Sequence, residues 1–348
     1  MKAVFVGDAY VTDEMMRNAA KQYLSESDTA EFFFFGEQNR GDMRDTVKKI
    51  EAHRREEIAV PDGLMEAVRN AELLIVHLCP VNADLLMRAK KLKAVLSCRG
   101  GTENIDLAFA AERGIIVTCN PAHNANAVAE YAIGLMICET RNISRADAAL
   151  KSGIWREKYP NTDSTIRELS DMTVGIVGYG SVGRLVAEKL EAFKCRVLVY
   201  DPFIDESAFD ILNQEFVGMD ELLENSDIIT IHARADKYLL DFEQFSKMKP
   251  TAYVINTARS IMINPEALTD ALDNGKILGA AIDVFESEPN IPDFYRKYDN
   301  ITITNHRGGD TINSYSDSPK FALKNWQNHE KGKKLRFWAN REYMNKNR

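Results

Sequence analysis

Residues 174–183 read VGIVGYGSVG, and this stretch decides the fold. Its apolar start is typical of a buried strand, and RLVAEKLEAF, which follows it, has the composition of a helix. Gly178, Gly180 and Gly183 therefore form a GxGxxG pattern between a strand and a helix. There the first glycine makes a tight turn, the second lets the backbone approach a pyrophosphate, and the third lets helix and strand pack closely. The helix N-terminus offers N–H groups and a positive dipole end to phosphates, so we expect dinucleotide binding.

An acidic residue follows the next strand of this unit. The strand RVLVY ends at Tyr200, and Asp201 comes 18 residues after Gly183. A carboxylate there accepts hydrogen bonds from both ribose hydroxyls and repels a 2′-phosphate, which favours NAD over NADP as the cofactor. Arg234, in HARAD, follows a later strand and lies either near the adenine ribose or, as we favour, on the solvated surface.

Apolar strands alternate with helical segments on both sides of the motif. Before it, we expect strands at residues 2–7, 31–36, 73–78 and 94–97, and a helix at 12–24. From the motif onward, we expect strands at residues 173–177, 196–200, 228–232, 252–256, 279–284 and 301–304. Strands that alternate with helices predict an α/β fold with two lobes, each a parallel sheet with flanking helices.

The two series of strands define the domains, since no linker of distinctive composition separates them. We expect residues 1–120 and 309–348 to form a discontinuous, flavodoxin-like substrate domain. A Rossmann domain at residues 121–308 would be inserted into it. The final helix would then return to the first lobe, with Trp326 and Trp338 as anchors.

Composition excludes several classes of function. The chain has 348 residues, of which 45% are hydrophobic, enough for about two domains. Its net charge of -8 offers no basic surface for nucleic acid. The five cysteines are odd in number and form no CxxC, which indicates reduced thiols and no metal site. The chain shows no signal peptide and no apolar run of ~18 residues, so we expect a cytoplasmic protein without a membrane partner.

Three polar residues follow later strands, where open α/β sheets bind ligands. Arg259 follows YVINTA, Glu288 follows AAIDVFES, and His306 follows ITITN. Singly, they read as a surface charge, a loop cap and a structural histidine. Together, they supply three functions. The guanidinium of Arg259 would bind the carboxylate of a substrate and polarise the adjacent carbonyl. The imidazole of His306 would exchange a proton near neutral pH, and the carboxylate of Glu288 would orient that imidazole. This set predicts hydride transfer to or from C2 of a small 2-hydroxy or 2-oxo acid.

From end to end, the chain resembles the D-isomer-specific 2-hydroxyacid dehydrogenases, which include D-lactate, glycerate, phosphoglycerate and formate dehydrogenases. GIVGYGSVG with YDP (residues 175–183 and 200–202) resembles the NAD signature of the family, and KMKPTAYVINTARS (247–260) its arginine signature. DVFESEP (283–289) and NHRGG (305–309) resemble the segments with the catalytic glutamate and histidine. SCRGGTENID (97–106) resembles the loop whose N–H groups hold the substrate carboxylate.

The resemblance implies a role for each matching residue. Arg259, Glu288 and His306 would be catalytic, and Asp283 would meet the nicotinamide carboxamide. The residues expected at the cofactor are Gly178, Gly180, Ser181, Val182, Gly183, Asp201, Ala233, Thr257, Ala258 and Asp283. The residues expected at the substrate are Arg99, Gly100, Gly101, Arg259 and Arg307.

The chain departs from the family pattern close to these residues. Ser260 replaces the usual glycine after the arginine, and Asn305 and Arg307 replace the usual proline and aliphatic residue beside the histidine. Arg99 and Arg307 add cations at motif positions, so we expect a polar or phosphorylated substrate of the glycerate, phosphoglycerate or sugar-acid type. The alternative is that both arginines point to solvent or pair with Glu103 and Asp310.

Two further expectations concern partners and the alternative function. Residues 126–140 read NAVAEYAIGLMICET, a helix so apolar that one lobe alone would not cover it, which predicts a homodimer. NPAHNANAVAE (120–130) resembles the family segment that starts a long dimer-forming helix. The alternative function is an NAD(H)-sensing, corepressor-like binding protein with little turnover. An amino-acid dehydrogenase would need a catalytic Lys or Asp, which the three residues do not supply.

Overall fold

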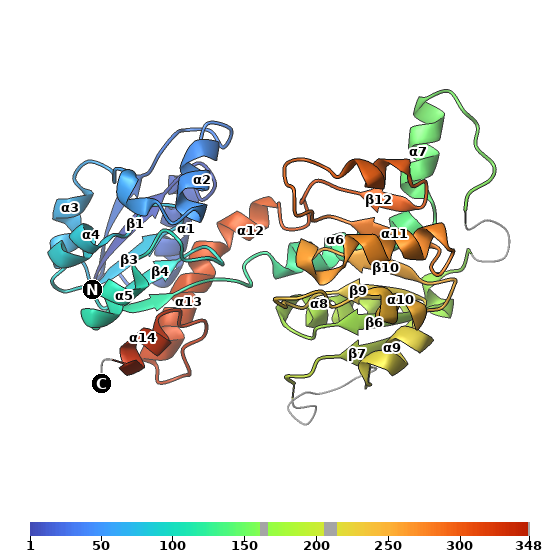
Figure 1. Ribbon diagram of the computed structural model, residues 1–348. Helices are drawn as coiled ribbons and strands as arrows, with labels where there is room; N and C mark the ends of the chain where they lie inside the picture. Colours follow the sequence, from blue (N-terminus) through green and yellow to red (C-terminus); the bar gives the residue numbers. More distant parts are fainter. Residues whose placement is uncertain (161–165, 205–213, 347–348) are drawn as a thin grey trace. The chain divides into compact units, whose positions relative to one another are not determined.

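The computed structural model describes residues 1–160, 166–204 and 214–346. The chain folds into two compact units, which we call the first lobe (Met1–Asn124 and Thr311–Arg348) and the second lobe (Ala125–Asp310). Figure 1 colours the chain along its sequence, so the first lobe contains both its blue and its red segments. Each lobe has one parallel sheet with helices on its faces, which confirms the expected α/β fold class.

The sheet of the first lobe has five parallel strands in the order β2-β1-β3-β4-β5. These strands are β1 (Lys2–Gly7), β2 (Thr29–Phe34), β3 (Leu73–Val76), β4 (Ala94–Ser97) and β5 (Ile116–Thr118). The helices are α1 (Asp13–Tyr23), α2 (Arg44–Glu51), α3 (Leu64–Ala67), α4 (Ala83–Arg88), α5 (Leu107–Glu112), α12 (Ile312–Ser316), α13 (Ser318–Glu330) and α14 (Arg341–Lys346), with single turns η1 (Arg55–Glu57) and η2 (Val68–Asn70). The sequence analysis did not predict β5, which has only three residues.

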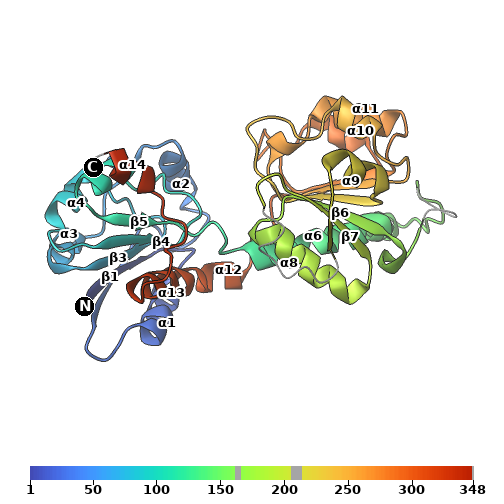
Figure 2. The same cartoon turned by 90° about the horizontal axis from the view of Figure 1, so that it is seen from below.

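Helix α13 completes one face of the first sheet. It packs against α1 and β4, and Trp326 is buried with Phe5 and Leu96 in one core. In Figure 2, α1 and α13 lie on one side of this sheet and α2, α3 and α4 on the other. Segments 304 residues apart in sequence are joined within this lobe by a hydrogen bond from Gln327 Nε2 to the Tyr23 oxygen.

The sheet of the second lobe has seven parallel strands in the order β12-β11-β10-β9-β6-β7-β8. These strands are β6 (Thr173–Val177), β7 (Arg196–Tyr200), β8 (Gln214–Phe216), β9 (Ile228–Ile231), β10 (Tyr253–Asn256), β11 (Gly279–Ile282) and β12 (Ile301–Ile303). The helices are α6 (Ala125–Thr140), α7 (Ile143–Lys151), α8 (Ser181–Leu190), α9 (Met219–Asn225), α10 (Phe242–Ser246) and α11 (Pro265–Asp273), with single turns η3 (Leu169–Asp171), η4 (Glu191–Phe193), η6 (Ser260–Met262) and η7 (Asp293–Lys297). The polar strand β8, QEF, was not predicted, since it carries no apolar run.

The order of the strands positions the ligand-binding edge of the second lobe. β6 lies between β7 and β9. The chain runs from β6 outward to β7 and β8 on one side, then returns to β9 on the other side, so the strand order reverses at β6. Open parallel sheets bind ligands at the carboxyl ends of strands at such a switch point. Two cores cover the faces of the sheet, one beneath α6 and α8 and the other beneath α9, α10 and α11 (Figure 2).

Helix α6 is covered mainly by its own lobe. It packs against α8, β10 and β11, and Ala129, Ala132 and Met136 are fully buried. The expectation that one lobe would not cover this helix is therefore wrong. Large exposed apolar side chains occur instead in the segment that follows it, at Ile143, Leu150, Ile154 and Trp155.

Candidate active site

The turn between β6 and α8 brings the three glycines of the motif together. Gly178 has φ +96°, and a Cβ there would lie 2.7 Å from the Ala233 nitrogen. A Cβ on Gly183 would lie 2.0 Å from the Gly178 oxygen, so neither position admits a side chain. A Cβ on Gly180 would meet no described atom within 4 Å. Gly178 and Gly183 thus serve close packing, whereas Gly180 faces open space.

Helix α8 begins at this open space. Gly180 is its N-cap, and Ser181, Val182 and Gly183 form the first turn. The first N–H groups of a helix have no partner within the helix, and its dipole favours an anion there. The turn therefore fits the pyrophosphate of a dinucleotide.

Asp201 lies beside the glycine turn, at the end of β7. Its Oδ2 accepts a hydrogen bond of 2.8 Å from the backbone N–H of Tyr179, and its Oδ1 accepts one of 3.0 Å from Phe203. These contacts fix the carboxylate while leaving lone pairs for ribose hydroxyls. The site therefore suits a cofactor with an unmodified adenine ribose.

Other expected cofactor residues follow β9 and β10. Ala233 approaches Gly178, and Ala258 is held by a hydrogen bond of 3.0 Å from its N–H to Asn256 Oδ1. Thr257 is buried, and its Oγ1 has no hydrogen-bond partner among the described residues. A buried hydroxyl without a partner is costly, and a polar group of a bound cofactor would satisfy it.

Glu288 and His306 are brought together from two loops of the second lobe. His306 Nδ1 lies 2.8 Å from Glu288 Oε2. The other carboxylate oxygen of Glu288 accepts a hydrogen bond of 2.9 Å from the Phe285 N–H, so its own loop fixes the carboxylate. The ring's Nε2 is therefore the nitrogen left to meet a substrate.

Asp283 holds the backbone that carries His306. Its carboxylate accepts hydrogen bonds from Thr304 Oγ1 (2.6 Å), the Arg307 N–H (3.0 Å) and the Gly308 N–H (2.9 Å), and its carbonyl accepts one from the His306 N–H (2.9 Å). His306 has φ +55°, an unusual conformation for a residue with a side chain. Asp283 thus positions the histidine, a role that the sequence alone did not reveal.

Arg259 is the third member of the expected set. It follows β10 in the same lobe, is exposed, and donates a hydrogen bond of 2.6 Å from Nη1 to the Ala258 oxygen. Partial burial lowers its pKa, the charge of Arg234 lowers it further, and Glu288 opposes this. Arg234 is exposed, and it lies close enough to Arg259 for their charges to interact.

The first lobe carries the expected carboxylate loop after β4. A Cβ on Gly100 would lie 3.3 Å from the Cα of Pro121, a tight contact with the backbone, whereas a Cβ on Gly101 would meet the flexible end of Glu103, 2.3 Å from Oε2. Arg99 Nη1 lies 3.6 Å from Glu103 Oε2. Arg307 belongs to the second lobe and pairs with Asp310 at 2.5 Å. The two added cations therefore lie on different lobes.

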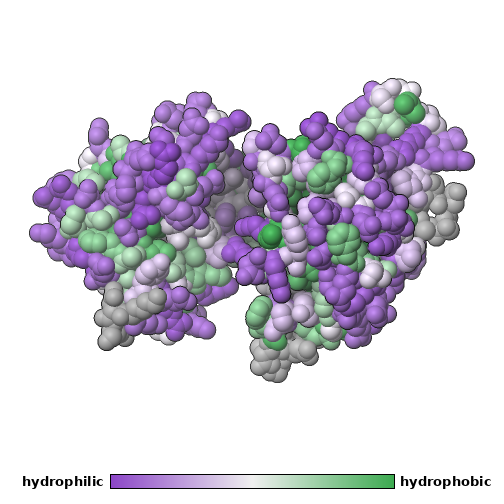
Figure 3. Space-filling view, in the orientation of Figure 1, coloured by the Kyte–Doolittle hydropathy of each residue, from purple (hydrophilic) through white to green (hydrophobic). Residues whose placement is uncertain are grey.

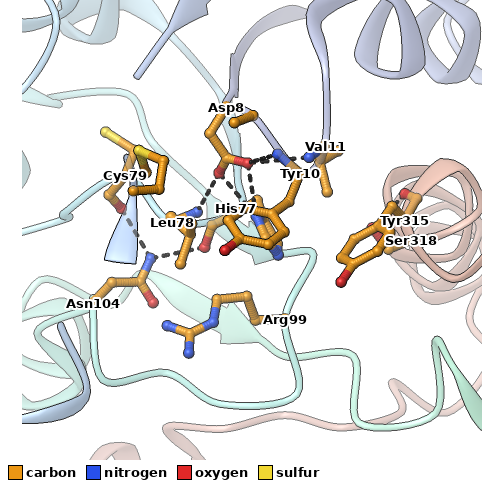
Figure 4. A network of polar contacts seen from close by, with 12 residues as sticks. Asp8, Tyr10, Val11, His77, Leu78, Cys79, Arg99, Asn104, Tyr315 and Ser318 are labelled. Atoms are coloured by element: carbon orange, nitrogen blue, oxygen red, sulfur yellow. Dashed lines mark hydrogen bonds and ion pairs between the residues drawn. The ribbon is translucent and has the colours of Figure 1, made fainter. Parts of the chain in front are cut away.

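The structure also reveals a polar pair that the sequence did not predict. Asp8 follows β1, His77 follows β3, and the imidazole Nδ1 lies 2.8 Å from Asp8 Oδ2 (Figure 4). Both residues follow buried strands in the sequence, which was the available signal. Their pairing depends on strand order, since 69 residues separate them.

Among the described residues, no group of three or more His, Cys, Asp and Glu side chains is arranged to hold a metal ion. No helix in the described part of the chain is long and apolar enough to cross a membrane.

Comparison with known families identifies the second lobe. Residues 133–308 match the model of the "D-isomer specific 2-hydroxyacid dehydrogenase, NAD binding domain". The match covers β6 to β12, and thus the glycine turn, Asp201 and the Arg259, Glu288 and His306 set.

Curated relatives extend the similarity beyond this lobe. The chain is 37% identical to a glyoxylate reductase of Thermofilum pendens over 273 residues, which cover 76% of this chain and 80% of the relative. It is 34% identical to a D-3-phosphoglycerate dehydrogenase of Methanocaldococcus jannaschii over 276 residues, 77% of this chain. The chain spans about half of that relative, 52%.

A solved structure supports the fold across both lobes. The NAD complex of a D-isomer specific 2-hydroxyacid dehydrogenase from Lactobacillus delbrueckii ssp. bulgaricus aligns with a TM-score of 0.76 and 19% identity. The alignment covers 97% of this chain and 99% of that one. At this identity the likeness concerns the fold.

Proposed function

The chain belongs to the D-isomer specific 2-hydroxyacid dehydrogenase family, and on that premise we propose that its substrate is a small, polar or phosphorylated 2-hydroxy or 2-oxo acid. It is an NAD-dependent oxidoreductase that acts on CH–OH groups. When bound, the cofactor would supply a hydride to C2 of the substrate as NADH or accept one from it as NAD⁺. The substrate class that we propose is that of glycerate, phosphoglycerate or sugar acids.

The observation that carries the proposed chemistry is the contact of His306 with Glu288. The 2.8 Å contact fixes the ring and leaves Nε2 for the C2 oxygen. In the direction of reduction, His306 donates a proton to that oxygen, and in oxidation it accepts one. Glu288 stabilises the imidazolium form, and Asp283 holds the backbone on both sides of the ring.

We assign Arg259 to the substrate itself. A guanidinium binds a carboxylate through two parallel hydrogen bonds and polarises the adjacent carbonyl. Arg234 adds a second positive charge nearby, which strengthens the attraction for an anionic substrate. Gly100 and Gly101 would hold the C1 carboxylate through backbone N–H groups, by analogy with the family.

The glycine turn and the ends of β7, β9 and β10 support the cofactor contacts that we propose. Ser181, Val182 and Gly183 would meet the pyrophosphate, Asp201 the adenine ribose, and Thr257 a polar group of the nicotinamide half. The carboxylate of Asp283 already accepts three hydrogen bonds, so its carbonyl or a remaining lone pair would serve the carboxamide.

A panel of 2-oxo acids with NADH tests the proposal. Glyoxylate, pyruvate, hydroxypyruvate, phosphohydroxypyruvate and longer sugar acids should be compared by kcat/KM, followed through NADH absorbance. We expect the hydroxylated or phosphorylated acids to exceed pyruvate by about tenfold or more. Preference for pyruvate would reject the substrate class, and NADH binding without turnover of any acid would favour the corepressor-like alternative.

We also propose a homodimer and a cytoplasmic location. α6 is covered by its own lobe, so the exposed apolar side chains of α7 and the following residues are the surface that a second copy would cover. Trp155 is 80% exposed, and Figure 3 shows green, hydrophobic atoms at the α7 end of the second lobe. All five cysteines are free, which suits a reducing compartment.

A further inference from the structure

Asp8 is fully buried at the carboxyl end of β1, yet its hydrogen-bond donors favour a negatively charged carboxylate. Its Oδ1 accepts hydrogen bonds from the N–H groups of Tyr10 (2.8 Å) and Val11 (3.1 Å), and its Oδ2 accepts one from Leu78 (3.0 Å). Burial raises the pKa of Asp8, but the charge and hydrogen bond of His77 and these N–H groups outweigh it, so the pKa lies below its usual value. The carboxylate is therefore a fixed negative charge.

This carboxylate determines how His77 is presented. The imidazole Nδ1 carries the proton that is shared with Asp8 Oδ2 over 2.8 Å, so Nε2 points away from Asp8. Asn104 fixes the backbone beside it, with its Nδ2 donating hydrogen bonds to the oxygens of His77 (3.1 Å) and Cys79 (2.9 Å). A histidine held in this way can meet an anion with its second nitrogen while Asp8 balances its charge.

The surroundings of His77 are rich in cations and aromatic rings. The ring centroid of Tyr10 lies 6.0 Å from that of the imidazole, and the ring centroid of Tyr315, in a T-shaped arrangement, lies 6.4 Å away. The Arg40 guanidinium stacks on both tyrosines, at 5.2 and 4.4 Å. These groups come from separate segments of the first lobe and form one cluster. Figure 4 shows its members Tyr10, His77 and Tyr315 near the carboxyl ends of β1 and β3.

Arg99 joins this cluster from the neighbouring strand. It follows β4, which pairs with β3, so Arg99 and His77 both follow the carboxyl ends of adjacent strands. Burial lowers the pKa of His123, and the charges of His77 and Arg99 lower it further, which places these three groups within electrostatic range. Figure 4 shows Arg99 on the side of Asp8 where the imidazole lies.

Arg99 lacks a strong partner. Its side chain is 15% exposed, and its buried Nη1 has no hydrogen-bond partner among the described residues. Glu103 Oε2 lies 3.6 Å away and is also without a hydrogen bond in the described part of the chain. A buried guanidinium with an unused N–H group gains stability from an added anionic acceptor.

We propose that His77 and Arg99 form an anion subsite in the first lobe, for a second carboxylate or a phosphate at the distal end of the substrate. Arg99 directly precedes Gly100, so the second anion would lie next to the group held by Gly100 and Gly101. This spacing suits a short-chain acid with negative groups at both ends. The inference rests on the proposed function, in which those glycines hold the C1 carboxylate. Asp8 is a positioning residue, since it acts through His77.

The kinetic test compares substrates that differ at the distal end. Phosphohydroxypyruvate and oxaloacetate carry a phosphate or a carboxylate there, and hydroxypyruvate and 2-oxobutyrate are their neutral counterparts. We expect wild-type kcat/KM to favour at least one anionic member of a pair by about tenfold or more. His77→Asn and Arg99→Gln should each remove most of that ratio. The two pairs distinguish phosphate from carboxylate as the preferred group.

His53→Asn is the matched control, because His53 is exposed in the same lobe and has φ +57°, which asparagine tolerates. It should leave the ratio unchanged. Asp8→Asn should lower the ratio, mainly by raising KM for the anionic substrate. If neutral substrates are turned over equally well, or if the ratio survives in both His77→Asn and Arg99→Gln, the inference is wrong while the proposed reaction stands.

A binding measurement separates the subsite from catalysis. The ring resonances of His77, assigned by their loss in His77→Asn, should shift when inorganic phosphate or malonate is added, and this shift should weaken in Arg99→Gln. The measurement decides the inference even if no 2-oxo acid is reduced, an outcome that would reject the proposed function. Unshifted resonances at saturating concentrations of both anions would overturn it.

Discussion

His306 Nδ1 lies 2.8 Å from Glu288 Oε2, and the second oxygen of Glu288 is held by the N–H of Phe285. The imidazole is thus oriented by a carboxylate that is itself anchored. Because Asp283 fixes the backbone of the same turn, the ring is restrained from two directions. The proton donor is therefore positioned by the second lobe alone.

Replacement of His306 tests its role in proton transfer. His306→Ala should lower kcat by roughly 10²–10⁴-fold, the usual contribution of a positioned acid or base, while NADH still binds. Steady-state kinetics and NADH fluorescence titration would measure the two effects. His53→Ala, at an exposed position, should retain activity. Near-normal kcat in His306→Ala would remove this residue from the mechanism.

Glu288→Gln tests the coupling of the two side chains. Reduction needs the protonated imidazole, so activity in that direction should fall as the pH rises and the ring loses its proton. Without the carboxylate the imidazolium is less stable, and we expect this fall to move to lower pH. The measurement is kcat against pH for both proteins. Superimposable profiles would mean that Glu288 does not act through His306.

Asp201→Ala tests the choice of cofactor. The loss of hydrogen bonds to the ribose, at roughly 1.5–3 kcal/mol for a charged acceptor, should weaken NADH binding about tenfold or more and narrow the gap to NADPH. The contact with the Tyr179 N–H is also lost, so the glycine turn is less well fixed. Asp236→Ala is a control at an exposed acid of the same lobe. A wild-type preference for NADPH would contradict this interpretation and would favour the alternative that Arg234 lies near the adenine ribose.

Trp155→Asp tests the proposed dimer surface. A charge at this exposed position would oppose burial against a second copy, so light scattering at micromolar concentration should change from dimer to monomer. Phe203→Asp is the matched control, because Phe203 is 92% exposed elsewhere on the same lobe. A wild-type monomer would reject the dimer, and a dimeric Trp155→Asp would place the interface on another surface.

His232 predicts how stability depends on pH. Burial lowers its pKa to about 3, and it contacts Thr230 Oγ1 at 2.9 Å. The unfolded chain takes up a proton near pH ~6.5, whereas the folded one does not until far lower pH, so stability falls as the pH drops below ~6.5. From pH 7 to pH 5 this group should cost up to about 2 kcal/mol. Urea unfolding should show a smaller loss in His232→Gln, and an equal loss in both proteins would exclude His232 as the cause.

The sequence predicted the features that depend on local pattern. The strand before Gly178, the acid after β7 and the helix capped by Thr12 all appear where expected. The strands β5 and β8 were not predicted, and β8 has no apolar run, whereas β12, which is equally short, was predicted from the alternating residues 301–304. Whether each of these elements could be predicted thus depended on the pattern of apolar and polar residues within the element itself.

Features that depend on distant residues were not predictable in this way. The pairing of Asp8 with His77 requires the order β1-β3, which no local pattern encodes. By contrast, the pairs of Arg307 with Asp310 and of Arg99 with Glu103 are local, and the sequence had offered both as the alternative to contact with the substrate. A role for Arg307 at the substrate stays a proposal. The sequence analysis placed the exposed apolar surface on α6, because the burial of α6 depends on its contacts with the distant strands β10 and β11. The exposed apolar side chains at α7 were therefore not predicted.

The return of α13 to the first lobe has a consequence for biosynthesis. Until α13 leaves the ribosome, the face of the sheet beneath α1 lacks Trp326 and exposes apolar side chains such as Phe5. The second lobe, whose residues are contiguous, is by then fully translated. The lobe that begins the chain is therefore the last to be completed, and its nascent apolar face is the part that a chaperone would need to protect.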